Sequence, residues 1–151
     1  MTELREALPV IIPLAIEWAV QASASGATRG QPLNARGLEL ARLVGVKHPE
    51  TVRVMVASDL PFPEHPVLVR AANETGLLGP HVTGLTLGHT VFIREGFLSP
   101  RLLSHELRHV AQYEEAGSIS NFLPGYLAQI VEVGYDDAPL EIDARNHEIA
   151  N

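Results

Sequence analysis

The chain has 151 residues, a net charge of −7 and no cysteine, and 46% of its residues are hydrophobic against 19% charged. This balance is typical of one globular domain and excludes a disordered chain, while the acidic charge and the single lysine disfavour nucleic acid and anionic membranes as partners. Without cysteine, disulfides and thiolate ligands are excluded, so a metal site would have to use His, Asp or Glu.

The N-terminal stretch predicts an amphipathic helix from about Glu3 to Ala24, disturbed by Pro9 and Pro13. It carries scattered charges and no basic start, which argues against a signal peptide or a membrane span. We therefore expect a cytoplasmic protein, with export by a route that uses no cleaved signal left open. The segment SASGATRGQP (23–32) is rich in turn-forming residues and predicts a break in the helix.

The next segments alternate between helix, strand and loop. The pattern of apolar residues predicts a short helix in 33–46 and a strand in 51–58. Three prolines in 59–66 predict a loop, and 66–80 predicts a helix closed by Gly76 or Gly79.

Two short strands and three helical segments complete the chain. The strands are expected at Leu85–Leu87 and Thr90–Arg94. Ser99 as N-cap and Pro100 at the first helical position predict a helix that Gly117 ends. A further helix or pair of turns follows in 118–134, and a terminal helix is expected from about Pro139.

The helix after Pro100 carries the motif HELRH, with His105, Glu106 and His109. At about 100° per residue the two histidines lie on one helix face, so their side chains can bind one ion. Glu106 projects beside that ion, where its carboxylate can hold a water molecule and accept its proton. The spacing therefore predicts two zinc ligands and a general base from one turn of helix.

A catalytic zinc site usually has a third protein ligand. Glu141, in PLEIDARN, is our candidate, because small Ala144 on the same side lets its helix approach the histidine helix closely. A carboxylate in the first turn is also favoured by the helix dipole without any metal. The alternatives are Glu115, His147, Asp143, Asp136 and Asp137.

HELRH followed by PLEIDA resembles the gluzincin metallopeptidases, whose third zinc ligand is a glutamate on a downstream helix. The Glu-x-x-Ala arrangement is similar to that of the Ste24/HtpX-like membrane group without its transmembrane helices. The stretch from Gly84 to Asn146 is more similar still to small soluble bacterial domains associated with extracellular contractile injection systems. Arg145 stands where the membrane group usually has Asp, so the groups that orient the ligands are expected to differ.

The resemblance implies an α+β, zincin-like single domain over residues 1–151, with a small mixed sheet and a helical N-terminal region. It also implies zinc at His105, His109 and Glu141, with Glu106 as general base. The strand Thr90–Arg94 would be a sheet edge along which a peptide substrate lies.

Peptide-bond hydrolysis also needs a donor for the oxyanion, and Tyr126 is preferred because it lies between the two ligand helices. Tyr135, His89, Arg108 and Arg145 are alternatives. The expected function is zinc-dependent peptide hydrolysis. The alternatives are a zinc-binding scaffold or interaction domain without catalysis and a secreted effector with one specific target.

Overall fold

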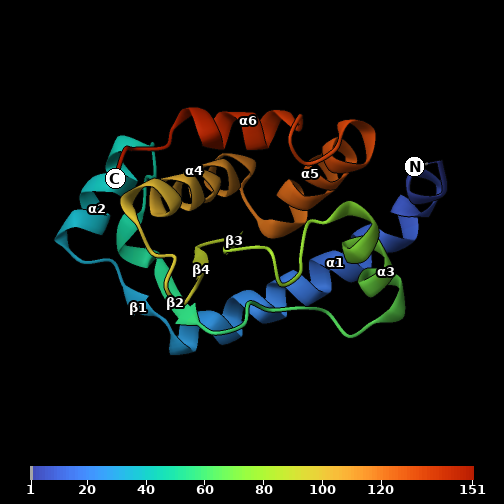
Figure 1. Ribbon diagram of the computed structural model, residues 1–151, viewed down its shortest axis with the longest axis horizontal. Coiled ribbons are helices and arrows are strands. Elements are labelled where there is room, and N and C mark those ends of the chain that lie inside the picture. The colour runs from blue at the N-terminus through green and yellow to red at the C-terminus, as the bar shows by residue number, and fades with distance from the viewer. Residues whose placement is uncertain (1) are drawn as a thin grey trace.

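The computed structural model describes residues 2–151, which form an α+β arrangement of six α-helices and four strands (Figure 1). This confirms the expected class and the small mixed sheet. The helices are α1 (Thr2–Arg29), α2 (Ala35–Leu43), α3 (Pro66–Thr75), α4 (Pro100–Ala116), α5 (Ile119–Val133) and α6 (Pro139–Asn146). The strands are β1 (Gln31–Pro32), β2 (Arg53–Ala57), β3 (Gly84–Leu87) and β4 (Thr90–Arg94), with a 3-10 turn at Pro49–Thr51.

The strands form one sheet in the order β1-β2-β4-β3, in which β2 and β4 are parallel and the outer pairs are antiparallel. Strand β4 is therefore paired on both sides, and the prediction that Thr90–Arg94 is an edge strand is wrong. The reason is visible in its residues, because Thr90 to Ile93 are all buried and a run buried on both faces belongs inside a sheet. The edge on this side is β3.

Strand β4 presents its side chains to two layers of helices. Val91 and Ile93 join an apolar cluster with Leu107 of α4 and with residues of α2. Phe92 points the other way and lies against Gly26 of α1. Figure 1 accordingly shows α1 on one side of the sheet and α4 on the other.

Helix α1 is longer than predicted and continues through Pro9 and Pro13. Each proline removes one helical hydrogen bond, but both side chains are exposed, so water can satisfy the carbonyl groups left free on that face. By length and composition alone, Glu3–Arg29 would suffice to cross a membrane, because an 18-residue window within it has a mean hydropathy of 1.5. One such helix is a weak indication, and here α1 packs against α3, α5 and the sheet.

The expected break at 23–32 is wrong for residues 23–29, which are helical. Small residues serve here for close packing: a Cβ added to Gly26 would lie 2.5 Å from the ring of Phe92. The hydroxyl of Ser23 donates to the carbonyl of Leu87 at 2.8 Å, and the hydroxyl of Thr90 donates to the carbonyl of Ser23 at 2.9 Å. Contact with the sheet thus outweighs the local tendency to turn.

Candidate metal centre

Helix α4 begins and ends as its sequence predicts. Ser99 accepts a hydrogen bond from the backbone N–H of Leu102, and Gly117 ends the helix in the left-handed conformation with a φ of 101°. Leu107 and Val110 are completely buried and hold the opposite side of the helix in the core. This anchoring fixes the direction in which the motif side chains project.

Helix α6 brings Glu141 to the two histidines. The Nε2 atom of His105 lies 3.2 Å from Oε1 of Glu141, and the Nε2 atom of His109 lies 3.0 Å from Oε2. All three side chains are buried, and one donor atom from each lies within 4.8 Å of the others. Ala144 is 0% exposed, which fits its expected role as the small residue where α6 meets α4.

The outer nitrogen of each imidazole also has a partner. Nδ1 of His105 lies 2.9 Å from Oε2 of Glu148, and Nδ1 of His109 lies 2.8 Å from Oε1 of Gln112. The amide of Gln112 donates to the carbonyl of Leu140 and to Asp143, which leaves its oxygen as the acceptor. Both partners are acceptors, so they hold the proton on Nδ1 and direct Nε2 towards Glu141.

Glu148 is a residue that sequence reasoning missed as a partner of the site. It lies beyond the end of α6 and reaches back to His105. The terminal segment is held there by the N–H of Ile149, which donates to Ser104 at 2.8 Å, and by Asn151, which accepts from the N–H of Arg101 at 2.9 Å. No periodic pattern marks such a fold-back, so only a buried histidine in need of a second partner could have suggested it.

The carboxylates and imidazoles of the cluster stabilise each other's charged forms. Burial alone would lower the pKa of His105, but hydrogen bonds to Glu141 and Glu148 and the charge of Glu106 raise it to about 9. Burial also opposes protonation of His109, whose pKa is nevertheless raised by Glu141 and Glu106. Burial raises the pKa of Glu141, but hydrogen bonds from the two imidazoles hold it well below its ordinary value. A divalent cation binding here would replace protons on the imidazoles.

The donor set and its spacing fit a zinc ion. Two ligands at about 2.1 Å from a tetrahedral ion lie about 3.4 Å apart. Oε1 of Glu141 lies 3.2 Å from His105, Oε2 lies 3.0 Å from His109, and one donor atom from each of the three residues lies within 4.8 Å of the others. Two imidazole nitrogens and a carboxylate form one of the known donor sets of catalytic zinc. The three residues could therefore hold a metal ion and leave a coordination position for water or substrate.

Glu106 lies beside the cluster and is held by strand β3. The hydroxyl of Thr86 donates to its Oε1 atom at 2.8 Å and to its backbone carbonyl at 3.0 Å. Burial raises the pKa of Glu106 more than the charges of His109 and His105 lower it. Glu106 lines one cavity with His109 and Glu141, and its charge interacts with both imidazoles of the cluster.

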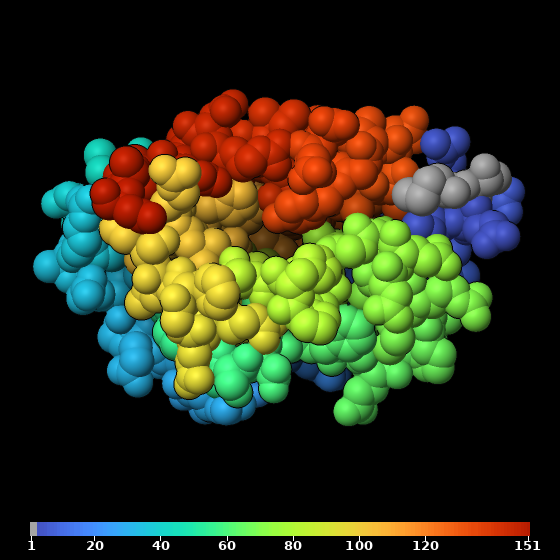
Figure 2. All heavy atoms as spheres, viewed as in Figure 1, coloured from blue at the N-terminus to red at the C-terminus, as the bar shows by residue number. Residues whose placement is uncertain are grey.

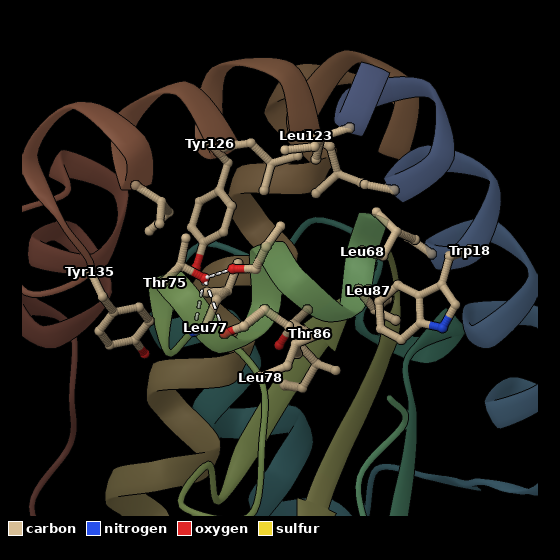
Figure 3. Close-up of a pocket in the computed structure, with 18 of the residues that line it drawn as sticks. Trp18, Leu68, Thr75, Leu77, Leu78, Thr86, Leu87, Leu123, Tyr126 and Tyr135 are labelled. Carbon is tan, nitrogen blue, oxygen red and sulfur yellow. Dashed lines mark hydrogen bonds between the residues drawn. The ribbon is translucent and has the colours of Figure 1, made fainter. Parts of the chain in front are cut away.

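Tyr126, the expected oxyanion donor, contacts Glu141, the candidate for the third ligand. Its hydroxyl donates to Oε2 of Glu141 at 2.7 Å. Figure 3 shows Tyr126 in the wall of the adjoining cavity. A phenol has one proton to donate, so this contact favours a role in orienting Glu141. Tyr135 lines the same cavity and is 38% exposed. Burial is the main cause that raises the pKa values of the Tyr126 and Tyr135 hydroxyls above the ordinary value for tyrosine. Both hydroxyls are therefore protonated at neutral pH.

The other candidates lie outside the cluster. Glu115, Asp136 and Asp137 are exposed, and Asp143 accepts hydrogen bonds from Arg108 and Gln112. His147, a further ligand candidate, pairs with Asp143. Three of the alternative oxyanion donors also have partners elsewhere: His89 pairs with Glu114, Arg108 with Asp143 and the carbonyl of Val44, and Arg145 with the carbonyl of Asp136. No family model, curated protein or solved structure matches this chain.

Proposed function

We propose that the protein is a zinc metallopeptidase with a zincin-like fold. The observation that carries the proposal is the meeting of His105, His109 and Glu141 at one buried point, with the carboxylate of Glu106 in the same cavity. The resemblance to gluzincins supports it, because the third ligand implied there is the residue that lies within 3.2 Å of both imidazoles.

Each residue has a defined part in this proposal. A zinc ion bound by the three ligands would polarise the substrate carbonyl and make water acidic enough to lose a proton near neutral pH. Glu106 accepts that proton and delivers it to the leaving amine. Tyr126 orients Glu141, and Tyr135 donates to the oxyanion from the open side of the cavity.

The proposed position of the peptide substrate is the edge of β3. This strand ends the sheet, and its Gly84 and Thr86 lie directly beside Glu106. An extended peptide can pair with such an edge through its backbone, which would bring its carbonyl groups past the metal cluster. Thr90–Arg94, which is paired on both sides, cannot take this part.

Two measurements on the full chain test the proposal. The metal content of purified protein should approach one zinc per chain and collapse in His105→Ala. Zinc-loaded wild type should cleave members of a peptide library, and Glu106→Gln should keep its zinc and lose turnover. If the protein binds zinc but cleaves neither the library peptides nor any protein in a cell extract, it is a zinc scaffold instead.

A further inference from the structure

The edge strand β3 is open to the surface at its start and closed at its end. Gly84 and Leu85 are half-buried, whereas Thr86 is 6% exposed and Leu87 is 3% exposed. The end of the strand is covered by α1, where the hydroxyl of Ser23 donates to the carbonyl of Leu87. A peptide that pairs with β3 can therefore approach from the side of Gly84 and cannot continue past Leu87.

The backbone groups of β3 define how far such pairing can extend. The N–H of Arg94 donates to the carbonyl of Thr83, so in the antiparallel register residues 83, 85 and 87 face β4 and residues 84 and 86 face outward. The outward carbonyl of Thr86 already accepts a hydrogen bond from the hydroxyl of Tyr113 at 3.2 Å. Gly84 can thus form a complete pair with one substrate residue, and the pairing ends at Thr86.

A stack of three aromatic rings forms the wall beyond Thr86. The ring centroids of Tyr113 and Phe122 are 3.9 Å apart, and those of Phe122 and Tyr126 are 5.3 Å apart. Tyr113 is 4% exposed and Phe122 is 6% exposed. The stack reaches from the edge strand to the metal cluster, because Tyr126 donates to Glu141. It closes the cleft on the inner side of the cluster.

The cavity beside the cluster is also too small for a chain to pass through. Its volume is about 120 Å³, and an apolar cavity of roughly 150 Å³ holds one benzene molecule. Figure 2 shows the surface hollowed between the orange part of the chain, which includes α5, and the green part that precedes β3. Residues from both parts line the cavity, whose inner walls include the buried residues Leu4, Ile11, Leu68 and Val131. The cleft thus leads inward from this hollow to a closed end.

The position of Glu106 indicates which bond would be cleaved. A Cβ added to Gly84 would lie 2.9 Å from its Oε2 atom, and the hydroxyl of Thr86 donates to its Oε1 atom at 2.8 Å. The carboxylate therefore lies beside the stretch from Gly84 to Thr86, which is about 7 Å of strand. With one substrate residue opposite Gly84 and the wall at Thr86, there is room for about one residue between the cleaved bond and the closed end.

We propose that the cleft admits one end of a peptide and that the protein is an aminopeptidase, which removes the amino-terminal residue. This deepens the proposed function and rests on it. Water breaks the C–N bond after the first residue, and its hydroxyl group joins the carbonyl carbon of the released amino acid. Glu106 carries the proton of that water to the new amino end of the remaining peptide. Bonds in the middle of a chain do not reach the cluster.

The hydrogen-bonding groups at the closed end select an amine. Burial raises the pKa of Tyr113, so its hydroxyl stays protonated, and it gives this proton to Thr86. Its oxygen can therefore only accept from a further partner, which suits the N–H of an amine and not a carboxylate. Antiparallel pairing, the slightly more stable kind, also directs the amino end of a peptide towards the end of β3.

The charges of the walls lead to the same end of the peptide. Within residues 2–151, which the structure describes, the cavity lining includes no lysine or arginine to pair with a terminal carboxylate. A peptide amine has a pKa of about 8 and becomes neutral at little cost, whereas a terminal carboxyl, with a pKa of about 3.5, stays charged at neutral pH. Burial of an unpaired charge is strongly unfavourable. The amino end is thus the end that the cavity accepts.

The first test compares three forms of one heptapeptide with the zinc-loaded protein: free, acetylated at the amino end and amidated at the carboxyl end. Mass spectrometry should show stepwise loss of single residues from the amino end of the free and amidated forms. The value of kcat/KM should be roughly 100-fold lower or less for the acetylated form. Glu106→Gln is the blank. Cleavage inside the acetylated peptide at the rate of the free one, or loss from the carboxyl end, would overturn the proposal.

The second test measures binding without turnover. Calorimetry with zinc-loaded Glu106→Gln and the same three peptides should show that acetylation weakens binding by about 10-fold or more, as loss of a hydrogen bond together with a steric block requires. Amidation of the carboxyl end should leave the affinity nearly unchanged, because that end lies outside the cleft. Equal affinities for the free and acetylated peptides would contradict a closed end that accepts the amine.

The third test removes the acceptor and keeps the ring. Tyr113→Phe should lower kcat/KM for the free peptide by about 10-fold and leave that for the acetylated peptide nearly unchanged. The matched control is Thr28→Val, because the hydroxyl of Thr28 donates to the carbonyl of Ala24 on the exposed surface of α1. Circular dichroism and zinc content establish that both variants are folded. Unchanged discrimination in folded Tyr113→Phe would overturn the assignment of the amine to this end.

These results separate the inference from the proposed function. If Glu106-dependent cleavage occurs inside peptides that are blocked at both ends, the aminopeptidase fails while the peptidase stands. If the protein binds no zinc and cleaves no peptide, the peptidase fails and the inference fails with it.

Discussion

Glu106 packs directly against the Cα atom of Gly84: a Cβ added there would lie 2.9 Å from Oε2 and 3.1 Å from Cγ and Cδ of the glutamate. The edge strand therefore leaves room for the carboxylate by having no side chain at this point. Thr86, two residues later, holds the other carboxylate oxygen. The general base of the proposed reaction is thus positioned by β3 as much as by its own helix.

Gly84→Ala should lower kcat while leaving zinc content and folding nearly unchanged. The added methyl group displaces the end of a flexible side chain and no backbone atom, so the cost in stability is small. A displacement of about 1 Å in a catalytic group can cost about 100-fold in rate. The matched control is Gly125→Ala, because a Cβ there meets nothing within 4 Å. Equal kcat values in the two variants would show that the position of Glu106 does not matter.

Glu148→Ala should weaken zinc binding by about 10- to 100-fold, since loss of a hydrogen-bond partner of a ligating histidine has effects of this size. The carboxylate lies 2.9 Å from Nδ1 of His105 and fixes the direction of that ring. Competition with a chelator measures the affinity. Glu115→Ala, at an exposed position on α4, is the control and should leave the affinity unchanged. An unchanged affinity in Glu148→Ala would contradict the role.

Tyr126→Phe and Tyr135→Phe separate two roles. Because the hydroxyl of Tyr126 binds Glu141, its loss should weaken zinc affinity, while kcat at saturating zinc should change little. Loss of the hydroxyl of Tyr135 should leave zinc affinity unchanged and lower kcat by about 100- to 1,000-fold, as for other oxyanion donors. The reverse result would restore Tyr126 to the role that its sequence position predicts.

Glu114→Gln should reduce stability at neutral pH by about 1.5–3 kcal/mol, the range for hydrogen bonds to a charged group. The Glu114 side chain is 6% exposed and accepts from the N–H groups of Lys47 and His48 and from His89. Burial raises its pKa, but these bonds hold the pKa below its ordinary value of 4.5.

The pH dependence of this effect follows from the direction of the shift. The lowered pKa stabilises the folded protein above pH 4.5, and this contribution is lost as the pH falls through the folded-state value. Denaturant unfolding of wild type and Glu114→Gln should therefore give curves that differ at pH 7 and converge under acid. A constant difference between pH 7 and pH 3 would contradict this account.

The sequence was sufficient to predict those features that depend on residues close together in the chain. Ser99 caps α4, Gly76 closes α3 with a φ of 69°, and the one-turn spacing of His105 and His109 places both imidazoles on one face. The meeting with Glu141 could also be anticipated, because a small residue at Ala144 marks the side of α6 that can approach another helix.

Long-range contacts could not be inferred in the same way. The residues around Gly26 form helix because they fit against Phe92, a partner more than sixty positions away. The buried run from Thr90 to Ile93 is typical of an inner strand, but it does not specify that β2 is the strand that enters between β1 and β4. Glu148 was missed for a similar reason. Its contact with His105 depends on how residues 147–151 fold back over α4, which the sequence does not indicate.

The two ends of the chain contribute to different parts of this molecule. The donors of the metal cluster and Glu106 all lie between residues 105 and 141, whereas one wall of the adjoining cavity belongs to α1, within the first 29 residues. Exchange of α1 between related sequences, by evolution or by design of chimeras, would reshape the space beside the cluster without altering any donor atom. A change in α1 can therefore alter the shape of this cavity while the donor atoms of the cluster stay in place.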